Sequence, residues 1–258
     1  MKMRVLSGVY LLAIYGFIFL PVAVLVIFSF QDGRLPVPPL KGLTLKWYAQ
    51  ILGDPALMSA LWHSLLVAVL SSAIAVTLGF LAAHALARHR LPGSVLMRGV
   101  LIAPMTVSYL IIALGLLGAI NQAGLSPSLW ITGIGHVVIN LPLCFAILFA
   151  SMGDHQKNIE RAARDLGASD LRVMWLISAP MLLPSIIAAF FLSVTFSWDE
   201  FIIAFLLTRF EVTLPVEIWS MLRSGLSPAT NAVGSLVFLI SITVLVLLEL
   251  LVFRKATP

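Results

Sequence analysis

Residues 129–207 contain two long apolar runs, LWITGIGHVVINLPLCFAILFASM (129–152) and LLPSIIAAFFLSVTFSWDEFIIAFLL (182–207), which flank the charged segment DHQKNIERAARDLGASDLRVMWLISAP (154–180). Each run is long enough to cross a hydrocarbon layer about 30 Å thick as a helix. A helix also satisfies its own backbone polar groups, which lipid cannot do. This stretch therefore predicts two membrane-spanning helices joined by an organised segment outside the membrane.

The whole chain is apolar in the same way. Of its 258 residues, 60% are hydrophobic and 10% are charged, whereas a soluble domain carries about 25% charged residues. The first apolar run is too long for the apolar region of a signal peptide, so we expect it to be a retained span. We predict an all-α polytopic membrane protein with six spans, approximately Leu6–Phe30, Leu61–Ala87, Val100–Ile120, Leu129–Met152, Leu182–Leu207 and Ala232–Phe253.

The Lys and Arg residues between the spans predict the orientation. Eleven lie on the side of the N-terminus and five on the other side, and basic residues favour the cytoplasmic side. Both termini are therefore expected in the cytoplasm, and the net charge of +5 reports topology rather than nucleic-acid binding. The cytoplasmic set is Lys2, Arg4, Arg88, Arg90, Arg98, Lys157, Arg161, Arg164, Arg172, Arg254 and Lys255, and the outer set is Arg34, Lys41, Lys46, Arg209 and Arg223.

The segment 154–180 has the sequence pattern of two short helices. Asn158 is expected to cap the first helix, with Glu160 in its first turn. Two i,i+4 ion pairs, Glu160–Arg164 and Arg161–Asp165, are expected along it. The helix should have one apolar face, formed by Ile159, Ala162, Ala163 and Leu166.

Gly167 is expected to end the first helix, and Ser169 to begin the second. The first helix presents small residues beside charges, which suits close approach of a soluble protein. The alternative is an amphipathic helix that rests on the membrane surface, for which the small alanine side chains are poor anchors.

The stretch RAARDLG (161–167), followed by Ile177 and Pro180, resembles the EAA loop of binding-protein-dependent ABC importer permeases. That motif reads Glu-Ala-Ala, three residues, Gly, nine residues, Ile, one residue, Leu-Pro. The spacing fits throughout. Arg161 stands where the family usually has Glu, and Ala179 stands where Leu is usual.

Further segments extend the resemblance over roughly residues 58–254. NLP (140–142) is similar to a segment that these permeases carry before the loop. SWDE (197–200) and LSPATNA (226–232) resemble the spermidine/putrescine branch. The chain is accordingly divided into residues 1–57, a first span with an outer loop, and residues 58–254, a five-helix permease core.

The resemblance implies a MetI-like ABC importer permease bundle in the bacterial inner membrane. Such a permease is not an enzyme and holds no cofactor or metal. The chain has no phosphate-binding loop of its own. The implied partners are a cytoplasmic ATPase dimer, a second and homologous permease subunit, a periplasmic binding protein and the lipid bilayer. Contact with the ATPase would fall on Glu160, Arg161, Ala162, Ala163, Asp165 and Gly167.

Charged side chains within a span are costly, so each is a candidate for function. Asp199 and Glu200 lie in the outer half of the fifth span and would attract a cationic substrate, with Trp198 adding a cation–π contact. Tyr109 and Asn140 are further candidates for the substrate path. The alternative for an acidic residue here is to cap a break in the helix or to pair with a basic residue of a partner subunit.

Other functions remain open at this stage. The five scattered histidines and the single Cys144 make a metal-dependent membrane enzyme a poor fit. A secondary transporter or channel would not need the long connection 154–180. Among importers, a polyamine or related organic cation is favoured, and thiamine, ferric iron, opines and phosphonates are alternatives. Two structural details are also expected, kinks at Pro104 and Pro142 and a short outer helix over Val212–Leu222.

Overall fold

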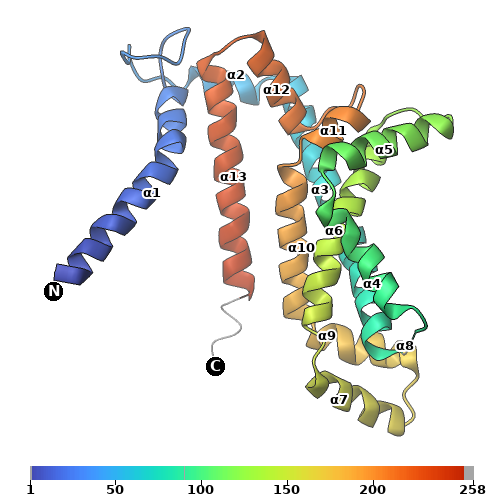
Figure 1. Ribbon diagram of the computed structural model, residues 1–258. Coiled ribbons are helices and arrows are strands. Elements are labelled where there is room, and N and C mark those ends of the chain that lie inside the picture. The colour runs from blue at the N-terminus through green and yellow to red at the C-terminus, as the bar shows by residue number, and fades with distance from the viewer. Residues whose placement is uncertain (1, 90, 253–258) are drawn as a thin grey trace. The chain divides into compact units, whose positions relative to one another are not determined.

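The computed structural model describes residues 2–89 and 91–252, and these residues are almost entirely helical (Figure 1). Three residues of the predicted cytoplasmic set, Arg90, Arg254 and Lys255, lie outside the described residues. In chain order the elements are α1 (Lys2–Ser29), α2 (Lys46–Leu52), α3 (Pro55–Arg88), α4 (Ser94–Ile102), the 3-10 helix η1 (Ala103–Thr106), α5 (Tyr109–Gln122), α6 (Leu129–Ala150), α7 (Asp154–Asp165), α8 (Asp170–Val173), the π-helix η2 (Met174–Ser178), α9 (Ala179–Met181), α10 (Leu183–Trp198), α11 (Ile202–Leu207), α12 (Leu214–Ser224) and α13 (Pro228–Val252).

The helices form two compact units. The first comprises Met1–Ser59 and Glu217–Thr243, and the second comprises Ala60–Val216 and Val244–Pro258. These two units are defined by contacts between residues. The division into a first span with its loop, residues 1–57, and a permease core, residues 58–254, has different boundaries and stays a prediction.

The membrane-spanning segments correspond to the predicted runs, but two of them are bent. Within the described residues, α1, α3 and α6 are each long and apolar enough to cross a membrane. Two bent helix pairs raise the number of spans to five. The 25-residue helix α13 accounts for the sixth predicted run. The predicted spans are therefore present, and the third and fifth of them are interrupted.

The bends follow from local chemistry. α4 with η1 meets α5 at 106°, where Pro104 cannot donate a backbone hydrogen bond and Val107 is extended. The kink expected at Pro104 is thus confirmed, whereas Pro142 lies inside the unbroken helix α6. The segment Asp170–Met181 meets α10 at 73°, just before Pro184 in the first turn of α10. The third predicted span is therefore bent, whereas the 73° bend lies at the start of the predicted run 182–207, whose helix is interrupted separately between Trp198 and Ile202.

In the first unit, the connection between α1 and α2 is organised around Gln31. The buried amide of Gln31 donates from Nε2 to the carbonyl oxygens of Val37 and Pro39, each at 3.2 Å. The side-chain Oε1 of Gln31 accepts a bond from the Lys41 N–H at 3.0 Å, and the backbone carbonyl of Gln31 accepts one from the indole Nε1 of Trp47 at 2.7 Å. Because these polar groups of Gln31 have partners, the connection is structured rather than a loose linker.

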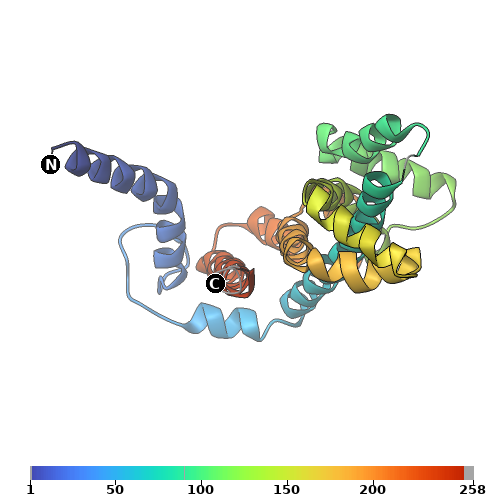
Figure 2. The same cartoon turned by 90° about the horizontal axis from the view of Figure 1, so that it is seen from below.

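In the second unit, α6 is the central helix. It packs against α10, α11, α4 and α5, and Figures 1 and 2 both show α10 beside it. The unit has two clusters of buried hydrophobic residues. One includes Phe80, Cys144, Phe145 and Leu148, so Cys144 is a buried core residue. The other joins α5, α6 and α11 and includes Ile203.

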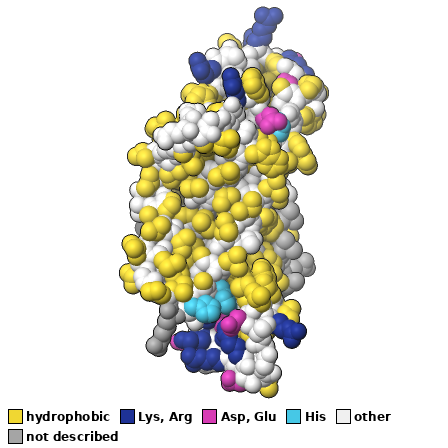
Figure 3. Space-filling model, turned by 90° about the vertical axis from the view of Figure 1, so that its right-hand side faces the viewer, with side chains coloured by type: hydrophobic (Ala, Val, Ile, Leu, Met, Phe, Trp, Pro, Cys, Tyr) yellow, Lys and Arg dark blue, Asp and Glu magenta, His cyan; other side chains and the backbone are white. Residues whose placement is uncertain are grey.

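The outer surface of the second unit fits a lipid environment. One face carries a broad band of hydrophobic side chains, and His, Lys and Arg side chains gather at the end that carries α7 and α8 (Figure 3). The predicted outer helix is present as α12, which starts two residues later than expected.

The packing of α6 against α11 depends on Gly135. A Cβ atom at this position would lie 2.5 Å from Cγ2 of Ile203, whereas a Cβ at Gly133 would meet nothing within 4 Å. Both glycines lie in α6. The close approach of α11 to α6 therefore requires a glycine at position 135 but not at position 133.

We expect Gly135→Ala and Gly133→Ala to change stability in opposite directions. Overpacking at Gly135 should lower the free energy of unfolding by about 1–3 kcal/mol. Gly133→Ala should raise it by up to about 1 kcal/mol, because alanine is the better helix former. Denaturant unfolding in detergent measures both, and equal effects of the two substitutions would contradict the proposed close contact.

Candidate functional site

The segment between α6 and α10 forms the two predicted helices and the glycine turn between them. α7 begins at Asp154 with Gly153 as its N-cap, so the prediction that Asn158 caps this helix was wrong. Residues 154–157 extend the helix by one turn, because Asp154 brings a negative charge to the positive end of the helix dipole. Ser169 precedes α8 as predicted.

Gly167 ends α7 in a Schellman motif. Its φ is +88°, a left-handed conformation that residues with a Cβ adopt at a cost. The Gly167 N–H donates to the carbonyl of Arg164 at 2.8 Å, and the Ala168 N–H donates to the carbonyl of Ala163 at 3.0 Å. These two bonds are the defining pair of the motif, so the predicted role of Gly167 as helix terminator is confirmed.

Glu160 faces into the protein. The residue is 1% exposed. Its Oε2 accepts a hydrogen bond from Arg88 Nε at 2.6 Å, and its Oε1 accepts one from the Ser178 hydroxyl at 2.8 Å. The carboxylate therefore fastens α7 to the end of α3 and to η2.

The predicted ion pair between Glu160 and Arg164 was wrong, because Glu160 is engaged by Arg88. Arg164 Nε instead donates to Asp170 Oδ1 at 2.7 Å, across the glycine turn. This contact with the Arg164 guanidinium lowers the pKa of the exposed Asp170 carboxyl. The ion pair is therefore complete at neutral pH and is lost only when the pH falls through that lowered value.

No ion pair joins Arg161 to Asp165 within the part of the chain that the structure describes, so that expectation was also wrong. Both residues are exposed. The predicted apolar face is present and is only partly covered by the described residues. Ile159 is 37% exposed and Leu166 is 90% exposed, and Ala162 is exposed beside them. Ala163 is half-buried.

We expect removal of the Arg88 charge to destabilise the fold strongly. Arg88→Gln would leave the Glu160 carboxylate buried without its cation, which costs about 3–5 kcal/mol in the free energy of unfolding. The matched control is Arg164→Gln, whose ion pair with Asp170 is exposed and should contribute little. Denaturant unfolding of the two variants in detergent is the measurement, and similar midpoints would contradict the importance of the buried pair.

A second polar site lies where the fifth span is interrupted. α10 ends at Trp198 with Asp199 as its C-cap, and α11 starts at Ile202. Glu200 lies between them and is buried. Its carboxylate accepts hydrogen bonds from the backbone N–H groups of Ile203, at 3.0 and 2.9 Å, and of Ala204, at 3.2 Å. Glu200 therefore caps the break, which was one of the alternatives left open by the sequence.

A chain of buried polar side chains supports this break. The Ser71 and Ser197 hydroxyls are 3.3 Å apart, and Ser197 Oγ lies 2.5 Å from Nδ1 of His136. Nε2 of the same histidine is 3.6 Å from Oε2 of Glu200. The series thus connects α3, α10 and α6 with the start of α11.

A cavity of about 570 Å³ opens beside the break. Tyr109, Asp199 and Glu200 line it together with Leu192, Thr195, Phe196, Phe201 and Ile202. Asp199 is exposed there, whereas the Glu200 side chain is occupied in capping. The C-terminal end of α10 adds the negative end of its dipole at the same place. The cavity is therefore suited to a cation.

Two of the five predicted path residues lie outside the residues that line this cavity. Trp198 is 7% exposed. Asn140 is buried, and its Nδ2 donates to the carbonyl of Ser193 at 3.4 Å. Sequence reasoning missed His136 and Ser197 as partners at the break. A signal was available for His136, because it lies one helical turn before Asn140 and a polar stripe in a span is unusual.

Comparison with known protein families identifies the family of the chain. Residues 75–257 match the family described as binding-protein-dependent transport system inner membrane component. The chain belongs to this family. It is accordingly a multi-pass inner-membrane subunit of an ABC importer and a transport component rather than an enzyme.

Curated relatives extend over nearly the whole chain. The chain is 30% identical over 254 residues to the spermidine/putrescine transport system permease protein PotC of Escherichia coli K12, covering 98% of this chain and 96% of the relative. It is 33% identical over 240 residues to the putrescine transport system permease protein PotI of the same organism, covering 89% and 84%.

Solved structures share the fold at lower identity. A bacterial ABC transporter for import of the acidic polysaccharide alginate matches with a TM-score of 0.70 and 19% identity, over 99% of this chain and 97% of that one. The alginate transporter bound to a pentasaccharide-loaded periplasmic protein matches with a TM-score of 0.72 and 14% identity, over 96% and 93%. At these identities the likeness establishes the MetI-like permease architecture.

Proposed function

We propose that the chain is the permease subunit of a polyamine importer, and that Asp199 meets the cationic substrate. The observation that carries this proposal is the exposed Asp199 carboxylate in the cavity beside the helix break. The aromatic ring of Tyr109 lines the same cavity and offers a cation–π surface. The names of the relatives PotC and PotI support the same substrate class.

The remaining predicted path residues take supporting roles in this proposal. Glu200 keeps the break in place through its bonds to Ile203 and Ala204. Trp198 and Asn140 are buried, and we assign them to the packing of the helices rather than to contact with the substrate. An interrupted helix near a substrate path is a recurrent arrangement in transporters, since helix ends present partial charges there.

We further propose that the segment 154–180 lies in the cytoplasm, with both termini on that side, and docks on a separate ATPase. The exposed apolar face of α7, with Ile159 and Leu166, is the surface offered to the ATPase. Ala162 and Ala163 allow close approach, and Gly167 sets the direction of the chain after α7. Arg161 and Asp165 are exposed at the edges of this face.

The complete importer proposed here has two ATPase copies, a second and homologous permease chain, and a periplasmic binding protein that delivers the substrate. Closure of the ATPase dimer would move the docked α7 helices. Because Glu160 ties α7 to α3 and η2, that movement would reach the membrane helices through a buried ion pair.

We expect Asp199→Asn to reduce polyamine transport without preventing assembly. Loss of the carboxylate should lower uptake about ten-fold or more, because two unit charges about 4 Å apart interact by several kcal/mol in a protein environment. Uptake of labelled spermidine and putrescine into proteoliposomes that contain the whole importer is the measurement.

The control for this substitution is Glu211→Gln, which removes an exposed acidic residue outside the cavity. Uptake by this control should equal that of the unchanged chain. If the importer assembles and hydrolyses ATP but polyamines neither enter nor stimulate it, the polyamine proposal is wrong and another solute must be sought.

We expect Leu166→Glu to weaken binding of the ATPase. A charged side chain at this exposed apolar position would have to be buried against the partner, which costs roughly 1–3 kcal/mol or about 5- to 150-fold in affinity. Leu166→Met is the control, since it keeps an apolar side chain of similar volume. Co-purification and titration of the ATPase measure the effect, and undiminished binding of Leu166→Glu would exclude this face as the docking surface.

A further inference from the structure

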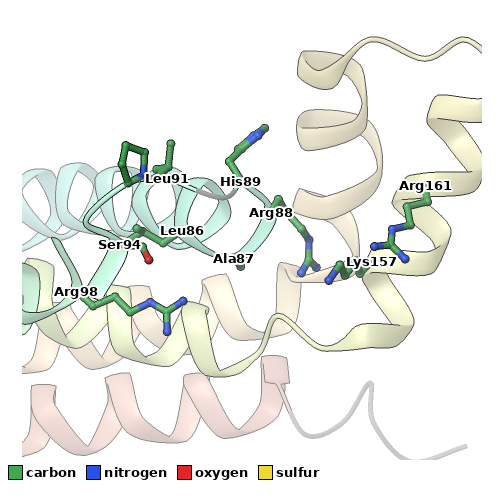
Figure 4. Close-up of a pocket in the computed structure, with 10 residues that line it drawn as sticks. Leu86, Ala87, Arg88, His89, Leu91, Ser94, Arg98, Lys157 and Arg161 are labelled. Carbon is green, nitrogen blue, oxygen red and sulfur yellow. The ribbon is translucent and has the colours of Figure 1, made fainter. Parts of the chain in front are cut away.

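A basic pocket lies between the end of α3, the start of α4 and α7, separate from the helix break and from the exposed apolar face of α7. Its volume is about 560 Å³. Five of its lining residues are basic or histidine, namely Arg88, His89, Arg98, Lys157 and Arg161, and none is acidic. Figure 4 shows the side chains of Arg88, Lys157 and Arg161 converging, with Arg98 extending toward them from α4.

Among the described residues, the pocket contains hydrogen-bond donors without a partner. The Arg88 side chain is 4% exposed, and its Nη2 is buried with no hydrogen-bond acceptor from that part of the chain. Nε of Arg98 is likewise buried and unpaired, while its guanidinium lies 4.4 Å from the centre of the Phe149 ring. Glu160 neutralises Arg88 from one side only, through Nε. Buried donors of this kind are normally satisfied, so the pocket is built for an anion with several acceptor oxygens.

An apolar groove adjoins the pocket and shares two lining residues with it, Leu86 and Leu91. The groove measures about 430 Å³ and is lined only by apolar side chains from α3 and α4 and the link between them. On α4 its lining residues include Leu96 and Val100, which are 72% and 64% exposed. The groove therefore presents an uncovered apolar surface directly beside a concentration of positive charge.

We infer that the pocket and groove together bind one anionic phospholipid, with the phosphate in the pocket and an acyl chain in the groove. A basic pocket at the membrane surface attracts the headgroup, and the adjacent apolar groove holds hydrocarbon. A free phosphate ion would use the pocket alone and leave the groove empty. The location at the cytoplasmic surface rests on the orientation proposed above, but the binding itself does not depend on polyamine transport.

Such a lipid would hold α7 against α3 and α4. Lys157 and Arg161 are one turn apart on α7, whereas Arg88 belongs to α3 and Arg98 to α4. One phosphate between them would hold three helices together by charge-assisted hydrogen bonds. The same position explains why Arg161 is compatible with this loop although the family usually has Glu there, since its charge faces an anion.

The inference is tested by measuring lipid binding to the purified full-length chain in detergent micelles by native mass spectrometry. The probes are palmitoyl-oleoyl phosphatidylglycerol, phosphatidylcholine with the same chains, and inorganic phosphate. We expect tighter binding of phosphatidylglycerol than of phosphatidylcholine. Arg98→Gln and Lys157→Gln should each weaken phosphatidylglycerol binding about five-fold, the typical effect of one basic residue near an anionic lipid.

Two matched controls separate the site from general surface charge. Arg172→Gln removes an exposed basic residue of α8 that does not line the pocket and should leave binding unchanged. In the groove, Val100→Asn should weaken lipid binding, whereas Val95→Asn, an exposed position of α4 outside the groove, should not.

Three results would overturn the inference. Equal binding of the two lipids would remove the requirement for an anionic headgroup. Displacement of the lipid by inorganic phosphate, with no effect of Val100→Asn, would identify a site for a free anion instead. If Lys157→Gln weakens ATPase binding while phosphatidylglycerol binding is unchanged, the pocket receives an acidic side chain of a protein partner. None of these results depends on transport activity, so they are distinguishable from failure of the polyamine proposal.

Discussion

The ion pair between Arg88 and Glu160 connects the membrane helices to the segment outside the membrane. Both side chains are almost fully buried, and a charge in such surroundings is tolerated only with a partner and further hydrogen bonds. Ser178 supplies the second bond to Glu160 from η2. The carboxylate thereby joins α3, α7 and the start of the fifth span. This connection uses one side of α7, and Ile159 and Leu166 are exposed on another side.

The interruption of the fifth span also requires hydrogen-bond partners for buried polar groups. Breaking a helix in a membrane leaves backbone N–H groups without acceptors, and lipid offers none. Glu200 accepts bonds from Ile203 and Ala204 and so allows α11 to start again. Gly135 lets α11 approach α6 closely, which keeps the restarted helix in place. The exposed Asp199 is then left at the end of α10, beside the cavity.

Sequence reasoning predicted features that depend on neighbouring residues and failed where distant residues decide. Gly167 and the turn after α7 were predictable because a Schellman motif is local. The pairing of Glu160 was not, because Arg88 is 72 positions away in the chain while Arg164 is one turn away. The acidic pair in the apolar run 182–207 allowed either a substrate contact or a capped helix break, and spacing alone did not decide between these roles. The three-dimensional neighbours of Glu200, above all His136, explain a role that spacing left undecided.

The uncovered apolar face of α7 also has a consequence for the cell. A chain that has not met its partners carries Leu166, 90% exposed, together with Ile159 on a helix outside the membrane. Surfaces of this type are bound by chaperones and proteases when they stay open. On the docking proposed for α7, surplus copies of the subunit would be the ones open to removal. The helix face proposed for assembly would then also match the amount of this chain to the supply of the protein that covers it.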